Sequence, residues 1–177
     1  ESIGAQNITA FAARDQARPK TDAFVAMLPP KLARMMVNMS GATKGRVLDP
    51  FCGTGVVLQE AALLGFDVYG TDLSDKMIDY SSINLEWLNQ THRLNTKPTL
   101  AQADAMTATW DSPIDAVACE TYLGQPFSAP PSPAKLTEVR GNCNHIISSF
   151  LTNLHSQIAS DTPLCIAVPA WKSKEGE

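Results

Sequence analysis

The chain has 177 residues, of which 44% are hydrophobic and 18% charged, and its formal net charge is −4. This length and composition suit one compact domain with one core, and the longest apolar run falls far short of the ~20 residues that cross a bilayer. No signal-peptide pattern opens the chain, so we expect a cytoplasmic protein without a membrane segment. The net charge lacks the basic footprint of a self-sufficient nucleic-acid binder, although basic residues cluster near the start: Arg14, Arg18, Lys20, Lys31 and Arg34.

The first predicted element is a helix that begins near Pro30, a residue suited to a first helical turn. Leu32, Met35, Met36 and Met39 follow at the i, i+3, i+4, i+7 spacing of one helix face. We interpret this methionine-rich stripe as core packing.

Strand and helix signals then alternate to the end of the chain. Strands are predicted at 46–48, 67–70, 99–103, 114–119 and 164–168, and helices at 56–64, 75–89 and 136–158. Gly65 suits a helix C-cap and Ser74 an N-cap. The alternation predicts an α/β fold with a mostly parallel sheet and helices on both faces. The segment 126–133 holds four prolines in eight residues, so we expect a stiff loop at the carboxyl edge of the sheet.

The four cysteines have no CxxC-like spacing, so we expect no zinc or other metal site. Cys119 and Cys165 lie in apolar strand-like runs and are expected to be small core residues with reduced thiols. His145 and His155 lie ten residues apart without a partner motif, and we interpret both as surface residues rather than ligands.

The strongest functional signal is the segment Asp49-Pro50-Phe51-Cys52-Gly53-Thr54-Gly55, which follows a predicted strand and opens a helix. In open α/β sheets, ligands bind at the carboxyl ends of the strands. Gly53 and Gly55 would let the backbone approach such a ligand closely, whereas a bare GxG can also be only a tight turn.

An acidic residue follows each of the next two strands. Asp72 is placed to bind both hydroxyls of a ribose, with a helix-capping role as the alternative, and Asp104 could equally be a turn residue. An NAD-binding Rossmann fingerprint fits less well, because Leu58 stands where its third glycine would be.

The segment 49–55 resembles motif I of the RNA and DNA amino-methyltransferases, which have a Rossmann-like class I fold and use S-adenosylmethionine. The resemblance implies that Asp49 and the backbone of residues 53–55 surround the amino-acid end of this cofactor. It also implies that Asp104 binds the exocyclic amine of the adenine. Further cofactor contacts are expected from Phe51, Leu73 and Ala105.

Arg18-Pro19 and the segment 27–33 resemble the region before motif I in the tRNA (guanine-10-N2) methyltransferase family, where a proline-headed helix packs beside the methionine end of the cofactor. Pro29 is expected there. We therefore divide the chain into an N-terminal extension and helix, 1–44, and a cofactor-binding core, 45–177. Related enzymes carry an N-terminal tRNA-binding THUMP region, and class I sheets end with two more strands. We expect the THUMP region to be absent, in keeping with a start at Glu1 rather than Met. We expect the last two strands to be absent too, because the sequence stops at Glu177, soon after the fifth predicted strand.

The similarity departs at the end of the fourth strand, where the family has Asp or Asn, two prolines and an aromatic residue. Here Glu120, one methylene longer, takes the acid position, and Thr121, Tyr122 and Leu123 follow. By the resemblance, Glu120 accepts a hydrogen bond from the target amine and Tyr122 stacks on the extruded base in a shifted register.

These signals predict an S-adenosylmethionine-dependent methyltransferase that acts on an exocyclic amine of a tRNA guanosine, with RNA held through an absent N-terminal domain. Two alternatives stay open because of the altered segment after the fourth strand. The enzyme could methylate DNA or a protein, or the chain could be a cofactor-binding module without catalysis.

Overall fold

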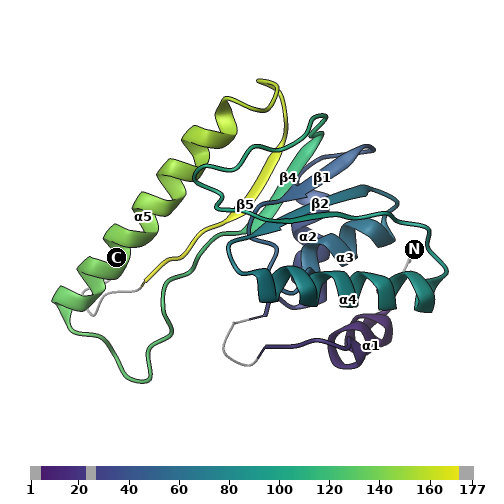
Figure 1. The fold of residues 1–177 in the computed structure, drawn as a ribbon. Helices are drawn as coiled ribbons and strands as arrows, with labels where there is room; N and C mark the ends of the chain where they lie inside the picture. The colour runs from purple at the N-terminus through teal and green to yellow at the C-terminus, as the bar shows by residue number, and fades with distance from the viewer. Residues whose placement is uncertain (1–4, 23–26, 172–177) are drawn as a thin grey trace.

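The computed structural model describes residues 5–22 and 27–171 and contains a five-stranded sheet in which every pairing is parallel (Figure 1). The strand order is β3-β2-β1-β4-β5. The strands are β1 (Arg46–Asp49), β2 (Asp67–Asp72), β3 (Thr99–Gln102), β4 (Ala116–Glu120) and β5 (Leu164–Ala167). Because the order reverses between β1 and β4, the carboxyl ends of these two strands flank a switch point where ligands bind in such sheets.

In the part of the chain that the structure describes, five helices accompany the sheet: α1 (Ile8–Ala17), α2 (Pro30–Met39), α3 (Val56–Leu63), α4 (Asp75–His92) and α5 (Pro133–His155). Helices α2, α3 and α4 pack on one face, where Val47, Val68 and Ala118 point into the core. Helix α5 and the 103–114 segment cover the other face, around Val117 and Phe150 (Figure 1). The predicted parallel α/β sheet with two covered faces is thus confirmed, and its strand ends shift by at most two residues from the predicted ones.

The methionine stripe of α2 packs differently from its prediction. Met36 is buried, but Leu32, Met35 and Met39 are 43%, 46% and 72% exposed. The helix instead contacts its neighbours through small side chains, since Ala33 and Val37 are fully buried. The expectation that the whole stripe forms core is therefore wrong.

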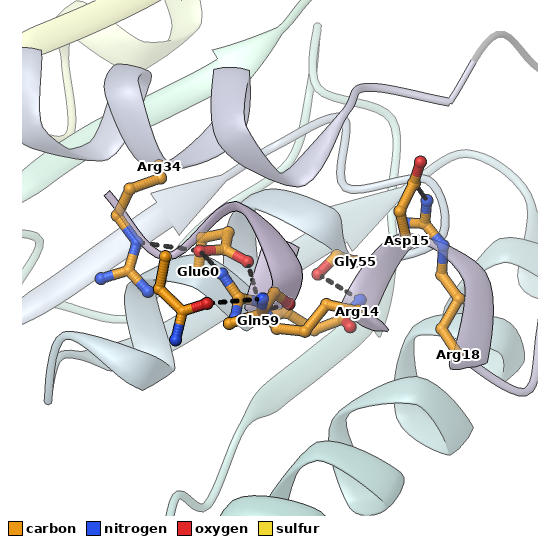
Figure 2. Close-up of polar contacts among 9 residues, drawn as sticks. Arg14, Asp15, Arg18, Arg34, Gly55, Gln59 and Glu60 are labelled. Atoms are coloured by element: carbon orange, nitrogen blue, oxygen red, sulfur yellow. Dashed lines mark hydrogen bonds and ion pairs between the residues drawn. The ribbon is translucent and has the colours of Figure 1, made fainter. Parts of the chain in front are cut away.

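Helix α1 was not predicted, and a buried ion-pair cluster fastens it to α3 (Figure 2). Glu60 is 1% exposed and accepts from Arg14 Nε at 2.6 Å and from Arg34 Nε at 2.8 Å. Arg18 is also buried and pairs with Asp15. Three members of the N-terminal basic cluster are thus engaged within the protein rather than arrayed for a nucleic acid.

Candidate functional site

The loop between β1 and α3, residues 50–55, is held by backbone and side-chain hydrogen bonds. Asp49 Oδ1 accepts from the Phe51 amide at 3.1 Å, which turns the chain directly after β1. The Cys52 amide donates to the Thr71 carbonyl at 2.9 Å, and the Gly55 amide donates to the Cys52 carbonyl at 2.7 Å. The loop is therefore fixed to both neighbouring strands before any ligand binds.

The two glycines of this loop, Gly53 and Gly55, differ in what surrounds the position of a side chain. Both have positive φ, 51° at Gly53 and 81° at Gly55. A Cβ at Gly53 would meet nothing within 4 Å, whereas a Cβ at Gly55 would lie 2.8 Å from Ser81 Oγ on α4. Gly53 thus borders open space that a ligand can occupy, and Gly55 allows α3 and α4 to pack closely.

Asp72 ends β2 and ties two loops together. Its Oδ2 accepts from the Gly53 amide and its Oδ1 from the Ser74 amide, both at 2.9 Å. A carboxylate has about four lone-pair positions, so these two bonds leave it able to accept from a ligand's hydroxyls.

Asn84, fully buried on α4, connects the same loop to the segment before α2. Its amide nitrogen donates to the carbonyls of Lys20 and Thr54, each at 2.9 Å, and its oxygen accepts from the Lys20 amide at 2.9 Å. No sequence motif singled out Asn84. Only the spatial meeting of residues 20, 54 and 84 reveals its role.

A cavity of about 1190 Å³ opens at the carboxyl ends of β1, β2 and β4. Every predicted site residue except Gly55 and Pro29 lines it: Asp49, Phe51, Gly53, Asp72, Leu73, Asp104, Ala105, Glu120 and Tyr122. Near Pro29, the lining is formed by Met27 and Leu28 instead. Sequence reasoning also missed the lining residues Asp22 and Lys76, which carry no recognisable motif.

Asp104 forms a turn at the cavity wall, since its Oδ1 accepts from the Met106 amide at 2.9 Å. The turn role and a ligand role are therefore compatible, because the side chain also borders the cavity.

The ionisable side chains that line the cavity are mainly acidic. Its charged lining consists of Asp22, Asp49, Asp72, Asp104, Glu120 and Lys76. Lys76 Nζ lies 2.6 Å from Asp22 Oδ2, so its charge is compensated locally. Burial raises the pKa of Asp49 well above its usual value, and burial also raises the pKa of Glu120. Because a positive charge nearby favours the ionised form of such carboxyl groups, a cationic ligand is favoured here over an anionic one.

The segment after β4 runs from Glu120 along the cavity and then onto α5. Thr121 extends the sheet pairing, because its amide donates to the Ala167 carbonyl at 3.0 Å. Tyr122 and Leu123 line the cavity and stay partly exposed. Gly124 has φ of 87°, and a Cβ there would lie 2.8 Å from Val139 Cγ1 of α5.

Within residues 5–22 and 27–171, no group of three or more His, Cys, Asp or Glu side chains is arranged to hold a metal ion. In the same part of the chain, no helix has the length and apolar character needed to span a membrane.

The parallel sheet with its switch point, the glycine loop after β1 and the acid at the end of β2 define a Rossmann-like domain of the class I methyltransferase type. The chain belongs to the family described as RMKL-like, methyltransferase domain, whose sequence model matches residues 18–173.

Named relatives point to the same family. The chain is 33% identical over 164 residues, 91% of its length, to a tRNA (guanine(10)-N2)-dimethyltransferase of Methanothermobacter thermautotrophicus, of which the match covers 45%. An enzyme of the same name from Pyrococcus abyssi is 52% identical over 60 residues, 34% of this chain and 18% of the relative. The chain thus spans less than half the length of these curated relatives.

Solved structures confirm the fold. TrmN from Thermus thermophilus superposes with a TM-score of 0.59 at 23% identity, covering 82% of this chain and 40% of TrmN. The glycopeptide N-methyltransferase MtfA, complexed with sinefungin, has a TM-score of 0.59 at 16% identity over 88% of this chain and 56% of MtfA. At these identities the likeness establishes the shared fold alone.

Proposed function

We propose that this chain is the catalytic domain of an S-adenosylmethionine-dependent methyltransferase that methylates an exocyclic amine of a tRNA guanosine. The observation that carries the proposal is one cavity that joins the glycine loop, Asp72 and Glu120 at the switch point of the sheet. The family and the names of the tRNA-modifying relatives support the same reading.

The charge of the cavity fits this cofactor. S-adenosylmethionine carries a sulfonium and an ammonium group, and carboxylates dominate the charged lining. A dinucleotide would bring a pyrophosphate instead, which the same carboxylates would repel. Leu58, at the place of the third dinucleotide-binding glycine, is fully buried in the core and not at the cavity.

Different residues of the lining would hold the amino-acid, ribose and adenine parts of the cofactor. Asp49 and the Gly53 backbone would hold the amino-acid end, and Asp72 the ribose hydroxyls. Asp104 would bind the adenine amine, with Phe51, Leu73 and Ala105 packing around it. When bound, the cofactor supplies a methyl group already activated on a sulfonium, so the protein mainly has to orient the acceptor.

Glu120 and Tyr122 are the proposed acceptor residues. Glu120 ends β4 at the cavity, where its carboxylate can accept a hydrogen bond from an amine and so direct the nitrogen lone pair. Tyr122 is 43% exposed at the same wall, which leaves a ring face for a base to stack on.

We further infer that the RNA is held largely outside the described fold, through an N-terminal RNA-binding region, and that the enzyme acts in the cytoplasm. The net charge of −4 and the internal ion pairs of Arg14, Arg18 and Arg34 support this inference.

Calorimetry with S-adenosylhomocysteine, S-adenosylmethionine and NAD tests the cofactor. Asp72→Asn should weaken binding of the first two by about tenfold or more. Asparagine replaces one of the two accepting oxygens with an NH2 donor, so too few acceptors remain for both the loop and a ribose. Asp67→Asn, an exposed position at the start of β2, is the matched control and should bind as wild type does. Binding of NAD without any response to S-adenosylhomocysteine would overturn the proposal.

A further inference from the structure

Helix α5 forms one wall of the cavity and is anchored at its C-terminal half. Asn153 Nδ2 donates to the carbonyls of Ala105 and Ala108 at 3.1 and 2.8 Å. Gln157, just past the helix, donates to the Ala108 carbonyl at 2.9 Å and accepts from the Trp110 amide at 2.9 Å. The helix is thus fixed to the segment that follows β3, which includes the cavity residues next to Asp104.

The N-terminal half of α5 is fixed by the segment after β4. Gly124 approaches Val139 and Cys143 so closely that a Cβ would lie 2.8 Å from Val139 Cγ1 and 3.5 Å from Cys143 Sγ. The same segment carries Glu120 and Tyr122. Helix α5 and the proposed acceptor residues therefore form one packed unit, and a side chain on the cavity face of α5 has a defined position relative to both.

Three residues of α5 reach the cavity: Asn142, His145 and Ile146. They are spaced i, i+3, i+4 and so share one helix face, close to the contact of Gly124 with Val139 and Cys143. Phe127, from the proline-rich loop, lines the same cavity. This end therefore combines aromatic rings with an amide and an imidazole, which both donate and accept hydrogen bonds.

The cavity is larger than a usual site for one small molecule. Sites for one small molecule usually measure about 300–1,000 Å³, and this cavity measures about 1190 Å³. The residues assigned to the cofactor lie at β1, β2 and the segment after β3. The α5 end has no role in that assignment.

We propose that Asn142 and His145 recognise the polar edge of the acceptor base, while Tyr122 and Phe127 contact its faces. This inference rests on the proposed function and names the residues that select the base. The edge of a guanine presents both donors and acceptors, which an asparagine amide and an imidazole can match. A site built to pair with such an edge discriminates strongly, because a wrong base leaves its polar groups unpaired.

The test uses matched residues on one helix. Asn142→Ala and His145→Ala are compared with Asn144→Ala and His155→Ala, whose side chains are exposed on α5 and lie outside the cavity lining. The assay is methyl transfer to unmodified tRNA by the protein that includes the proposed N-terminal RNA-binding region, with nucleoside mass spectrometry of the product. Calorimetry with S-adenosylhomocysteine and melting temperatures are measured in parallel.

We expect kcat/KM for tRNA to fall about tenfold or more in each cavity variant and less than about twofold in each control. The affinity for S-adenosylhomocysteine should stay unchanged in all four variants. If wild type methylates tRNA and the cavity variants match their controls, this inference alone is overturned. If wild type binds the cofactor product but methylates no tRNA, the proposed acceptor fails, and the base-recognition role fails with it.

Discussion

Glu120 combines a strand-end position with a partly buried carboxylate, and both properties enter its proposed role. Its pKa is raised by burial, so the carboxylate form is lost at a higher pH than for an ordinary glutamate. If the carboxylate orients the amine, kcat should fall as the pH is lowered through this raised pKa. Glu120→Gln should keep part of the activity without that acidic limb, and Glu120→Ala should lose about 10²-fold.

Glu120→Gln should also change the stability of the protein, by an amount that depends on pH. A raised pKa in the folded state means that the folded protein binds this proton more tightly than the unfolded chain does. The resulting stabilisation is present at low pH and is lost as pH rises through the folded pKa. Glu120→Gln should therefore melt higher than wild type at pH 7, and the difference should shrink in acid. If Glu120→Gln and wild type melt at the same temperature at pH 7, and Glu120→Ala reacts as fast as wild type, then Glu120 has no role in the site.

The two loop glycines should respond differently to alanine. Both substitutions place a side chain at positive φ, at a cost of about 1–2 kcal/mol. Gly55→Ala adds a contact of 2.8 Å with Ser81 and should lower the free energy of unfolding further. Gly53→Ala meets open space, so its larger effect should be on the affinity for S-adenosylhomocysteine. Urea unfolding and calorimetry on both variants separate these effects, and a reversed order would contradict the assignment.

At the residue scale, the sequence singled out this loop because its distinctive residues are neighbours in the chain. Residues 49–55 contain the turn-forming acid and both glycines in one continuous segment. The sequence could not show that Gly55 is constrained by Ser81, which is 26 positions away and on another helix. Asn84 was missed for the same reason.

At the element scale, the predictions from sequence failed where the spacing of hydrophobic residues does not indicate which residues are buried. Helix α1 has one buried residue, Arg14, whose partner Glu60 lies 46 positions away, so no apolar period marks the helix. In α2 the methionines follow a helical period, yet the small residues Ala33 and Val37 make the closest packing. Hydrophobic spacing predicts that a helix forms, but which face is buried depends on its neighbours.

Removing Glu60 should release α1. Glu60→Gln leaves Arg14 without its charge partner in buried surroundings and should lower the free energy of unfolding by about 3 kcal/mol, measured in urea. Limited proteolysis should then cut earlier near residues 8–20 than in wild type. Glu86→Gln, at an exposed position on α4, is the control and should change the stability by less than about 0.5 kcal/mol. Equal stability of both variants would show that the cluster does not hold α1.

At the scale of the whole molecule, the order of elements was sufficient to predict the parallel sheet, because alternating strands and helices are compatible with only a few sheet topologies. The cavity was predictable where strand ends form it. Its α5 wall was not, because Asn142 and His145 follow a segment whose course the sequence leaves open, namely the proline-rich stretch 126–133. His145 was expected to be a surface residue; it is exposed, but it is exposed at the cavity.

The charge of the whole molecule predicts weak binding of RNA by this chain. Phosphate contacts supply most non-specific affinity, whereas the net charge is −4 and Arg14 and Arg34 are engaged with Glu60. A filter-binding titration with tRNA at physiological salt should therefore give a Kd no tighter than about 10⁻⁶ M, the limit of non-specific binding. An unrelated RNA of equal length is the control and should bind with similar affinity. Tight and selective binding of tRNA by these 177 residues would contradict the inference that a further RNA-binding region supplies the contacts.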